Sequence, residues 1–314
     1  MNRKILAVVM ALVVAGFAVG NVFAARDKIG TTVSFLKLGA GVKPLAMGSA
    51  YAGIANDVNS IYWNPAGLAG MQKKEITAMY NLMYQGVDFS DMGYGYIAAG
   101  IPLGKLGTVG YALNYFTAGS IEKRLTDTTD AAGTFSASYM SNTLGYGIAL
   151  GNLELGLGLK FINGTIDSTA SNLAIGADLG VMYNFNSSLG LGLAIQNLGT
   201  PLKFAASEDP LPLNIKLGVG YKTGKLSAGV DVNVPTDNDV NFALGAEYAL
   251  AFGSISLPLR LGFNTARMQD LGAMSGLSLG LGVGINDMLC FDLAWLPQGD
   301  QLGNTYSIAL TFKF

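Results

Sequence analysis

The residue types that most often carry chemistry are scarce in this sequence. It has no histidine and a single cysteine, Cys290, which removes the usual general base, the commonest metal ligand and the middle member of a Ser-His-Asp triad. Asp and Glu remain as acid–base groups, but no two of them stand at a diagnostic spacing, and the sequence has no Walker-type phosphate loop. The sequence therefore predicts a protein that is not an enzyme, with no catalytic residue, metal site or cofactor.

Charged residues are few, but seven of them occupy equivalent places in alternating segments. Only 13% of the residues are charged, about half the usual share of roughly 25%, and each of the seven is flanked by apolar residues. Because buried charges need partners, we expect them to pair with one another or with another part of the chain. They are Lys160, Asp178, Lys216, Asp231, Glu247, Arg260 and Asp292.

The elements that carry these charges alternate with a period of two. Between Leu153 and Phe161 every odd position is apolar, while the even positions are Glu154, two glycines and Lys160, the pattern of a strand with one apolar face. In a soluble sandwich the second face would be densely charged, but here it is mostly glycine, alanine, serine and asparagine. That composition favours the lumen of a membrane barrel whose apolar face meets lipid. No run of about 18 apolar residues follows the first two dozen, so a spanning helix is not predicted.

The alternation predicts an all-β fold, a transmembrane antiparallel β-barrel of about 14 strands over residues 75–314. Connections after the even-numbered strands are short, and most of those after the odd-numbered strands are longer, as in Thr117–Gly133 and Gly199–Pro212. Short periplasmic turns and longer external loops are typical of such barrels. An even count places both ends of the barrel on the periplasmic side. The predicted strand centres are Tyr80, Tyr96, Tyr111, Leu144, Leu157, Leu179, Leu193, Leu217, Val230, Leu244, Leu261, Leu281, Leu293 and Ile308.

The N-terminus reads as a cleaved signal peptide over residues 1–24. Arg3 and Lys4 precede an apolar stretch, and Val22-Phe23-Ala24 supplies cleavage-type residues before Ala25. With a formal net charge of −2 and no basic patch, no nucleic-acid partner is expected. The predicted location is the outer membrane of a Gram-negative-type (diderm) bacterium, with outer-membrane lipid around the barrel.

The last strand ends on an aromatic residue. The residues on its apolar face are Tyr306, Ile308, Leu310, Phe312 and Phe314. A terminal aromatic strand of this kind resembles the recognition signal of the barrel-assembly machinery, which we therefore expect as a partner through Phe314. The alternative is an ordinary amphipathic last strand.

Residues 25–74 do not alternate and contain three recognisable stretches, Ala46-Met47-Gly48-Ser49-Ala50, Asn56-Asp57 and Tyr62-Trp63-Asn64-Pro65-Ala66-Gly67-Leu68. They resemble the N-terminal region of the PorV/PorQ family, within the FadL-like outer-membrane proteins. The resemblance implies a fourteen-stranded barrel whose N-terminal segment folds into the lumen as a hatch, or plug. The motif Asn64, Pro65, Ala66 and Gly67 would then be structural or gating.

The inward faces of the predicted strands are rich in glycine, which is consistent with an occupied lumen. A barrel of this size is too wide to be filled by its own side chains, and 43 glycines in 314 residues are about twice the usual share of roughly 7%. Met47, Tyr51, Tyr62 and Trp63 could line a path for an apolar ligand, or could be core residues. Pro258 falls within a predicted strand, where it marks a possible irregularity in the wall.

The resemblance leaves more than one function open. FadL-like members pass hydrophobic small molecules across the outer membrane, whereas PorV-like members act in protein secretion and surface attachment. A structural surface barrel is a third possibility. From the sequence we favour movement of hydrophobic compounds, with secreted proteins as the alternative cargo.

Overall fold

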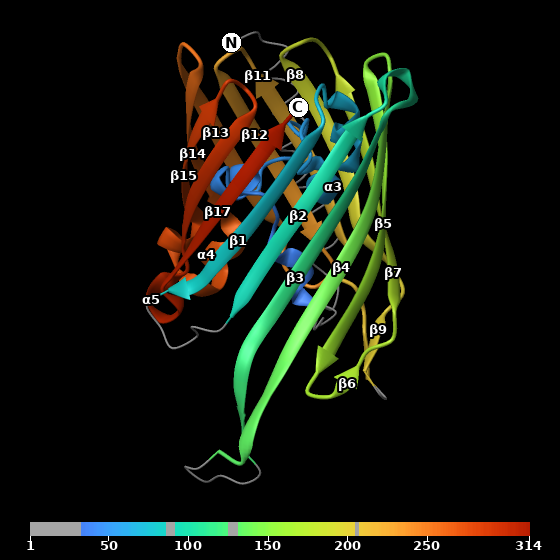
Figure 1. Cartoon of the computed structure of the whole chain (residues 1–314), viewed down its shortest axis with the longest axis vertical. Helices are drawn as coiled ribbons and strands as arrows, with labels where there is room; N and C mark the ends of the chain where they lie inside the picture. Colours follow the sequence, from blue (N-terminus) through green and yellow to red (C-terminus); the bar gives the residue numbers. More distant parts are fainter. Residues whose placement is uncertain (1–32, 86–91, 125–130, 205–206) are drawn as a thin grey trace.

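The computed structural model describes residues 33–85, 92–124, 131–204 and 207–314. The predicted signal peptide, residues 1–24, and residues 25–32 of the predicted hatch lie outside the described residues. Helices are short and strands dominate (Figure 1). No helix among the described residues is long and apolar enough to cross a membrane.

Fourteen strands form one closed antiparallel barrel. Each strand of the ring pairs with the next one along the chain, including β4 with β5, and the pairing of the first strand, β1, with the last, β17, closes the ring. The predicted fourteen-stranded barrel is confirmed, and every predicted strand centre lies inside one of its strands. The strands are β1 (Glu75–Gln85), β2 (Gly93–Pro102), β3 (Thr108–Lys123), β4 (Gly133–Leu150), β5 (Leu153–Ile166), β7 (Ala174–Asn184), β8 (Leu189–Gly199), β11 (Asn214–Lys222), β12 (Leu226–Pro235), β13 (Asn241–Phe252), β14 (Ile255–Asn264), β15 (Leu277–Ile285), β16 (Leu289–Pro297) and β17 (Asn304–Lys313).

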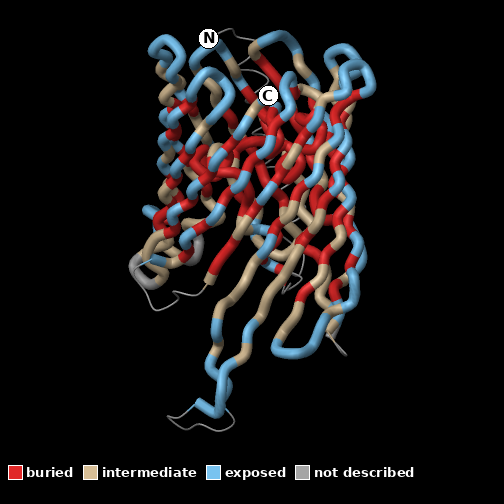
Figure 2. The backbone as a smooth tube through the Cα atoms, in the orientation of Figure 1, coloured by how far each residue is buried: buried red, intermediate tan, exposed pale blue. Residues whose placement is uncertain are grey.

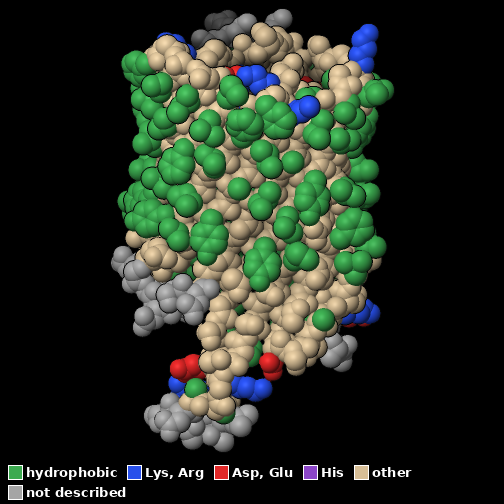
Figure 3. Space-filling model, in the orientation of Figure 1, with side chains coloured by type: hydrophobic (Ala, Val, Ile, Leu, Met, Phe, Trp, Pro, Cys, Tyr) green, Lys and Arg blue, Asp and Glu red, His purple; other side chains and the backbone are tan. Residues whose placement is uncertain are grey.

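The outer face of the wall is apolar. In β1 buried and exposed residues alternate, and the exposed ones include Ile76, Tyr80 and Leu82. Figure 3 shows apolar side chains over the middle of this face, with charged side chains confined to its two ends. Because a bilayer offers no partner to free backbone groups, a closed barrel with such a face suits a membrane.

The two ends of the barrel differ in their connections. The C-terminus lies at the end with short turns (Figure 1), such as the turn of η3 (Gly104–Leu106) between β2 and β3. The other end carries longer connections with their own elements, which are β6 (Thr169–Ala170), β9 (Leu202–Phe204), β10 (Ser207–Asp209), α4 (Thr265–Leu271), η4 (Ala273–Gly276) and α5 (Gly299–Leu302). We call these the short-turn end and the long-loop end.

One predicted loop is partly strand. The sequence predicts a loop over Thr117–Gly133, but β3 continues through Thr117 to Lys123, where it pairs with the start of β4 at Gly133. The two strands form a hairpin that projects beyond the rest of the barrel (Figure 1). A shift in register between Thr117 and Ser120 lets the pairing continue up to Lys123. The sequence did not predict this extension, because the bulge interrupts the alternation of apolar and polar residues in a stretch of small and hydroxylated residues.

The N-terminal residues fold inside the barrel. Residues 33–74, here called the luminal segment, contain η1 (Ser34–Lys37), α2 (Val42–Ala46), α3 (Ser60–Trp63) and η2 (Pro65–Gly70). Most of these residues are buried, and Figure 2 shows them as buried chain within the ring of strands.

Candidate functional site

The luminal segment touches one side of the wall with its backbone. A Cβ built on Gly192 of β8 would lie 1.9 Å from the carbonyl oxygen of Ala52, and one on Gly262 of β14 would lie 1.9 Å from the backbone nitrogen of Gly48. Real Cβ atoms do not approach backbone atoms so closely, so these positions require glycine. An added Cβ would also lie less than 3 Å from a backbone atom of the luminal segment at six further wall glycines, which are Gly156, Gly180, Gly218, Gly220, Gly229 and Gly245.

On the opposite side most of the contact is made by side chains, although a Cβ on Gly147 of β4 would also lie 2.8 Å from the backbone nitrogen of Ala69. Cβ atoms on Gly145 of β4 and Gly100 of β2 would meet the ends of Ile61 and Met71, at 2.8 and 2.6 Å. Val58 donates its backbone N–H to Glu75 of β1, and α2 packs against β16 and β17. Every strand of the ring is therefore in contact with the luminal segment.

Hydrogen bonds fasten the backbone-contacting side. One carboxylate oxygen of Asp231 accepts the backbone N–H groups of Tyr51 and Ala52, at 2.8 and 2.9 Å. The hydroxyl of Ser278 accepts from the N–H of Gly48 and donates to the carbonyl of Ala46. Wall side chains thus satisfy backbone groups that the irregular segment leaves without partners.

The predicted motif shapes the segment locally. Asn64 caps η2 by accepting the N–H of Ala66, and its amide donates to the carbonyl of Ala52 at 2.9 Å. Pro65 is the first residue of η2, where its missing N–H costs nothing. A Cβ on Gly67 would lie 2.6 Å from the carbonyl oxygen of Ala55. These contacts are structural, and a gating role for the motif stays a prediction.

The four predicted path residues separate into two pairs. Met47 and Tyr51 are fully buried at 0% exposure. Burial raises the pKa of Tyr51 well above its ordinary value and the Asp57 carboxylate adds to this, so the hydroxyl stays protonated and donates to Asp57 at 2.6 Å. Tyr62 and Trp63, in contrast, line a cavity of about 240 Å³ at the long-loop end.

That cavity has both apolar and polar lining groups. The ammonium groups of Lys160 and Lys216 lie 5.9 and 5.0 Å from the ring centres of Tyr62 and Trp63. Much of the remaining lining is amide, from Gln196, Asn197, Asn214, Asn233, Asn238, Asn241 and Asn264. These polar groups interrupt the apolar part of the lining, and leaving them beside a hydrocarbon without hydrogen-bond partners would cost free energy.

All seven predicted luminal charges are paired. Lys160 meets Asp178 at 2.8 Å and Lys216 meets Asp231 at 3.7 Å. Arg260 contacts Glu247 at 2.6 Å and Asp292 at 2.5 Å. The expectation that these buried charges pair is confirmed.

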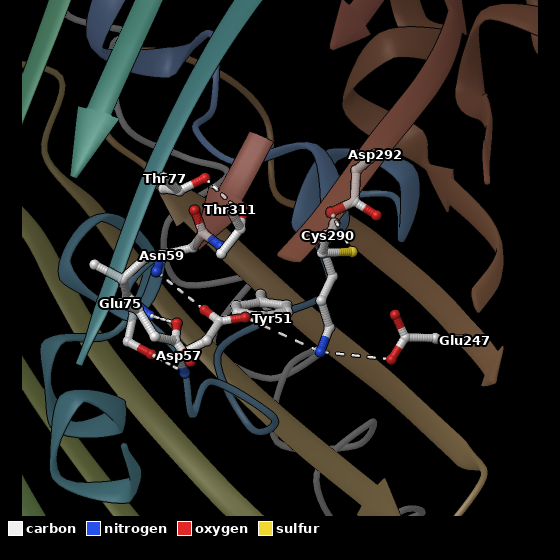
Figure 4. Close-up of polar contacts among 12 residues, drawn as sticks. Tyr51, Asp57, Asn59, Glu75, Thr77, Glu247, Cys290, Asp292 and Thr311 are labelled. Carbon is white, nitrogen blue, oxygen red and sulfur yellow. Dashed lines mark hydrogen bonds and ion pairs between the residues drawn. The ribbon is translucent and has the colours of Figure 1, made fainter. Parts of the chain in front are cut away.

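The structure adds partners that the sequence did not reveal (Figure 4). Lys43 of the luminal segment lies 3.5 Å from Glu247 and 4.0 Å from Asp57. Glu75 and Lys313 lie 3.0 Å apart across the closing pair of strands. The pairing of Glu75 with Lys313 could have been predicted from the sequence, because closing the barrel sets the first and last strands side by side. Nothing in the sequence marks Lys43 as a partner of these charges.

Pro258 lies in β14 and lines a charged cavity at the short-turn end. The ladder to β15 lacks pairs at Leu257 and Pro258 but resumes at Leu259 in the same register. Shifts in register occur instead between Leu82 and Gln85 of β1, in β3, and between Ala177 and Leu179 of β7. Whether Pro258 opens the wall stays a prediction.

The architecture defines a class before it defines a family: an outer-membrane β-barrel whose lumen is occupied by its own N-terminal segment. The sequence profile described as "Type IX secretion system protein PorV" matches residues 22–233. The chain belongs to this PorV family.

Solved structures show the same fold at low sequence identity. The Ralstonia pickettii toluene transporter TbuX is 14% identical with a TM-score of 0.60, and the match covers 88% of this chain and 98% of that one. The Pseudomonas putida toluene transporter TodX is 10% identical with a TM-score of 0.62 and the same coverage. A Pseudomonas aeruginosa FadL homologue is 13% identical with a TM-score of 0.55, over 92% and 100% of the two chains. No curated protein sequence matches the chain.

Proposed function

We propose that this outer-membrane barrel serves protein secretion of the Type IX kind as a sealed membrane scaffold, and that it does not act as a channel for hydrophobic compounds. The observation that carries the proposal is the contact of the luminal segment with every strand of the wall, much of it between the segment backbone and wall glycines. The family description names the secretion system. The toluene transporters share the fold, but at 10–14% identity they support the fold alone.

The chemistry of the lumen supports the same choice. A route for hydrophobic compounds needs connected apolar surface, but the apolar lining of the cavity beside Tyr62 and Trp63 is interrupted by amides and lysines. The cavity that contains Lys43 and Arg260, at the other end, is lined largely by charges. Met47 and Tyr51 are packed against the wall between the two ends.

The outside of the barrel offers surface that a scaffold would use. The hairpin of β3 and β4 projects beyond the other strands at the long-loop end (Figure 1), which the sequence predicts to face the exterior. A projecting hairpin carries backbone groups and side chains to a partner without opening the lumen.

A deletion strain tests the proposal. The strain is compared with its parent and with the same strain complemented by the wild-type chain. We expect deletion to abolish the release of secreted proteins and complementation to restore it, and we expect labelled toluene uptake to be the same in all strains.

Transport of hydrophobic compounds is the alternative, supported by the fold it shares with the toluene transporters. It is favoured if deletion leaves secretion intact and lowers toluene uptake, and if complementation with the wild-type chain restores uptake. Loss of neither activity on deletion would favour a purely structural barrel.

A further inference from the structure

A second polar cavity opens at the short-turn end, between the luminal segment and the wall. Its volume is about 460 Å³, within the range of roughly 300–1,000 Å³ found for small-molecule sites. The luminal segment contributes Gly53, Asn56, Gly70 and Gln72, and the wall contributes ends of β5, β7, β8 and β11. This end is the one predicted to face the periplasm.

Lys222, the last residue of β11, lines this cavity and forms no ion pair with a carboxylate in the part of the chain that the structure describes. Its position has the same parity as Lys216, so it lies on the inward face. The other lysine and arginine residues on inward strand positions, Lys160, Lys216, Arg260 and Lys313, each have a carboxylate within 4.0 Å. Among the described residues no carboxylate comes that close to Lys222.

Among the described residues that line the cavity, the single carboxylate is already hydrogen-bonded. Glu154 of β5 accepts a hydrogen bond from the amide of Asn184 at 3.0 Å and forms no ion pair with Lys222 within the described structure. The other polar side chains of the lining are neutral and able to donate, namely Asn56, Gln72, Asn152, Asn186, Ser187 and Ser188. An ammonium surrounded by neutral donors is a place where an anion gains charge-assisted hydrogen bonds.

We propose that this cavity binds the anionic group, carboxylate or phosphate, of a small polar molecule, with Lys222 as its counter-ion. The remaining volume holds the polar body of the ligand against the amide and hydroxyl groups. The site is independent of the proposed role in secretion, because it lies on the opposite side of the luminal segment from the projecting hairpin.

Calorimetric titration of the full chain in detergent micelles tests the site, with inorganic phosphate as one probe and N-acetylglycine as the other. We expect saturable binding of at least one probe with a Kd of about 1 mM or tighter, and the probe that binds identifies the source of the charge. Lys222→Met keeps the alkyl chain and should weaken binding about tenfold or more, whereas Lys222→Arg should retain it.

Two further variants separate a binding role from general charge. Lys225→Met removes an exposed lysine from the neighbouring turn of the same hairpin and should leave Kd unchanged. Glu154→Gln keeps the acceptor for Asn184 but removes the negative charge, and should tighten binding severalfold. Absence of saturable binding of both probes, an equal loss in Lys225→Met, or weaker binding in Glu154→Gln would each overturn the proposal.

Discussion

The two sides of the barrel wall hold the luminal segment by different means. On the side of β8 to β15, wall glycines admit the segment backbone, and Asp231 and Ser278 bond to its amide and carbonyl groups. On the side of β1 to β4, large inward side chains such as Met79, Tyr94 and Tyr96 are buried with apolar residues of the segment. The first contact is rigid because backbone atoms cannot move aside, and the second is adjustable because side chains can change rotamer.

The largest effect is expected at Asp231. The change Asp231→Ala removes the acceptor of two segment N–H groups and leaves Lys216 buried without its partner. Breaking a buried pair in this way costs about 3–5 kcal/mol. Urea-dependent unfolding from lipid vesicles should show this loss, and an unfolding free energy within error of wild type would contradict the role of Asp231 in fastening the segment.

Gly192→Ala probes the rigid contact directly. The new methyl group would lie 1.9 Å from the carbonyl oxygen of Ala52, and overpacking against backbone costs about 3 kcal/mol or more. The fraction of protein with folded, heat-modifiable migration in unboiled gels should fall. Gly224→Ala is the matched control, because nothing lies within 4 Å of its Cβ position.

Gly145→Ala makes the equivalent change on the adjustable side. The methyl group meets the side-chain ends of Ile61 and Leu68, at 2.8 and 2.9 Å. Since both side chains can shift, we expect the unfolding free energy to fall by about 1 kcal/mol, measured by urea-dependent unfolding from lipid vesicles. A loss as large as that of Gly192→Ala would show that the two sides do not differ.

Tyr96→Phe should have the smallest effect, in the opposite direction. The Tyr96 hydroxyl is buried and has no hydrogen-bond partner among the residues that the structure describes, so its removal should raise the unfolding free energy by up to about 1 kcal/mol. Tyr94→Phe is the control, since the Tyr94 hydroxyl accepts from Asn114 at 2.6 Å and its loss should destabilise.

The wall was predictable from the sequence and the fastening of the segment was not. Each strand carries its own period of two, so β5 is recognisable from Leu153 to Phe161 without any other part of the chain. The partner of Gly192, in contrast, lies 140 residues away at Ala52, and no local pattern encodes that contact.

Residue type alone also could not show whether a side chain lines a path for a ligand or is packed in the core. Met47 and Tyr51 have the side chains of an apolar site, yet both are fully enclosed. Whether a side chain is exposed depends on how the luminal segment is folded inside the barrel. The motif around Asn64 marks the segment in the sequence but does not predict that conformation. The pairing of the charged residues was predictable, because a buried charge needs a partner whichever residue supplies it.

The closing pair of strands has a consequence for how the protein forms. The luminal segment leads directly into β1, β1 pairs with β17, and the N–H of Phe314 bonds to the carbonyl of Lys74. Closure therefore waits for the last residues of the chain, and by then the segment must already lie inside, because its backbone contacts with the wall leave no clearance for later insertion. Contacts this distant in sequence make folding slow, so the unclosed intermediate is the species that assembly factors would have to protect.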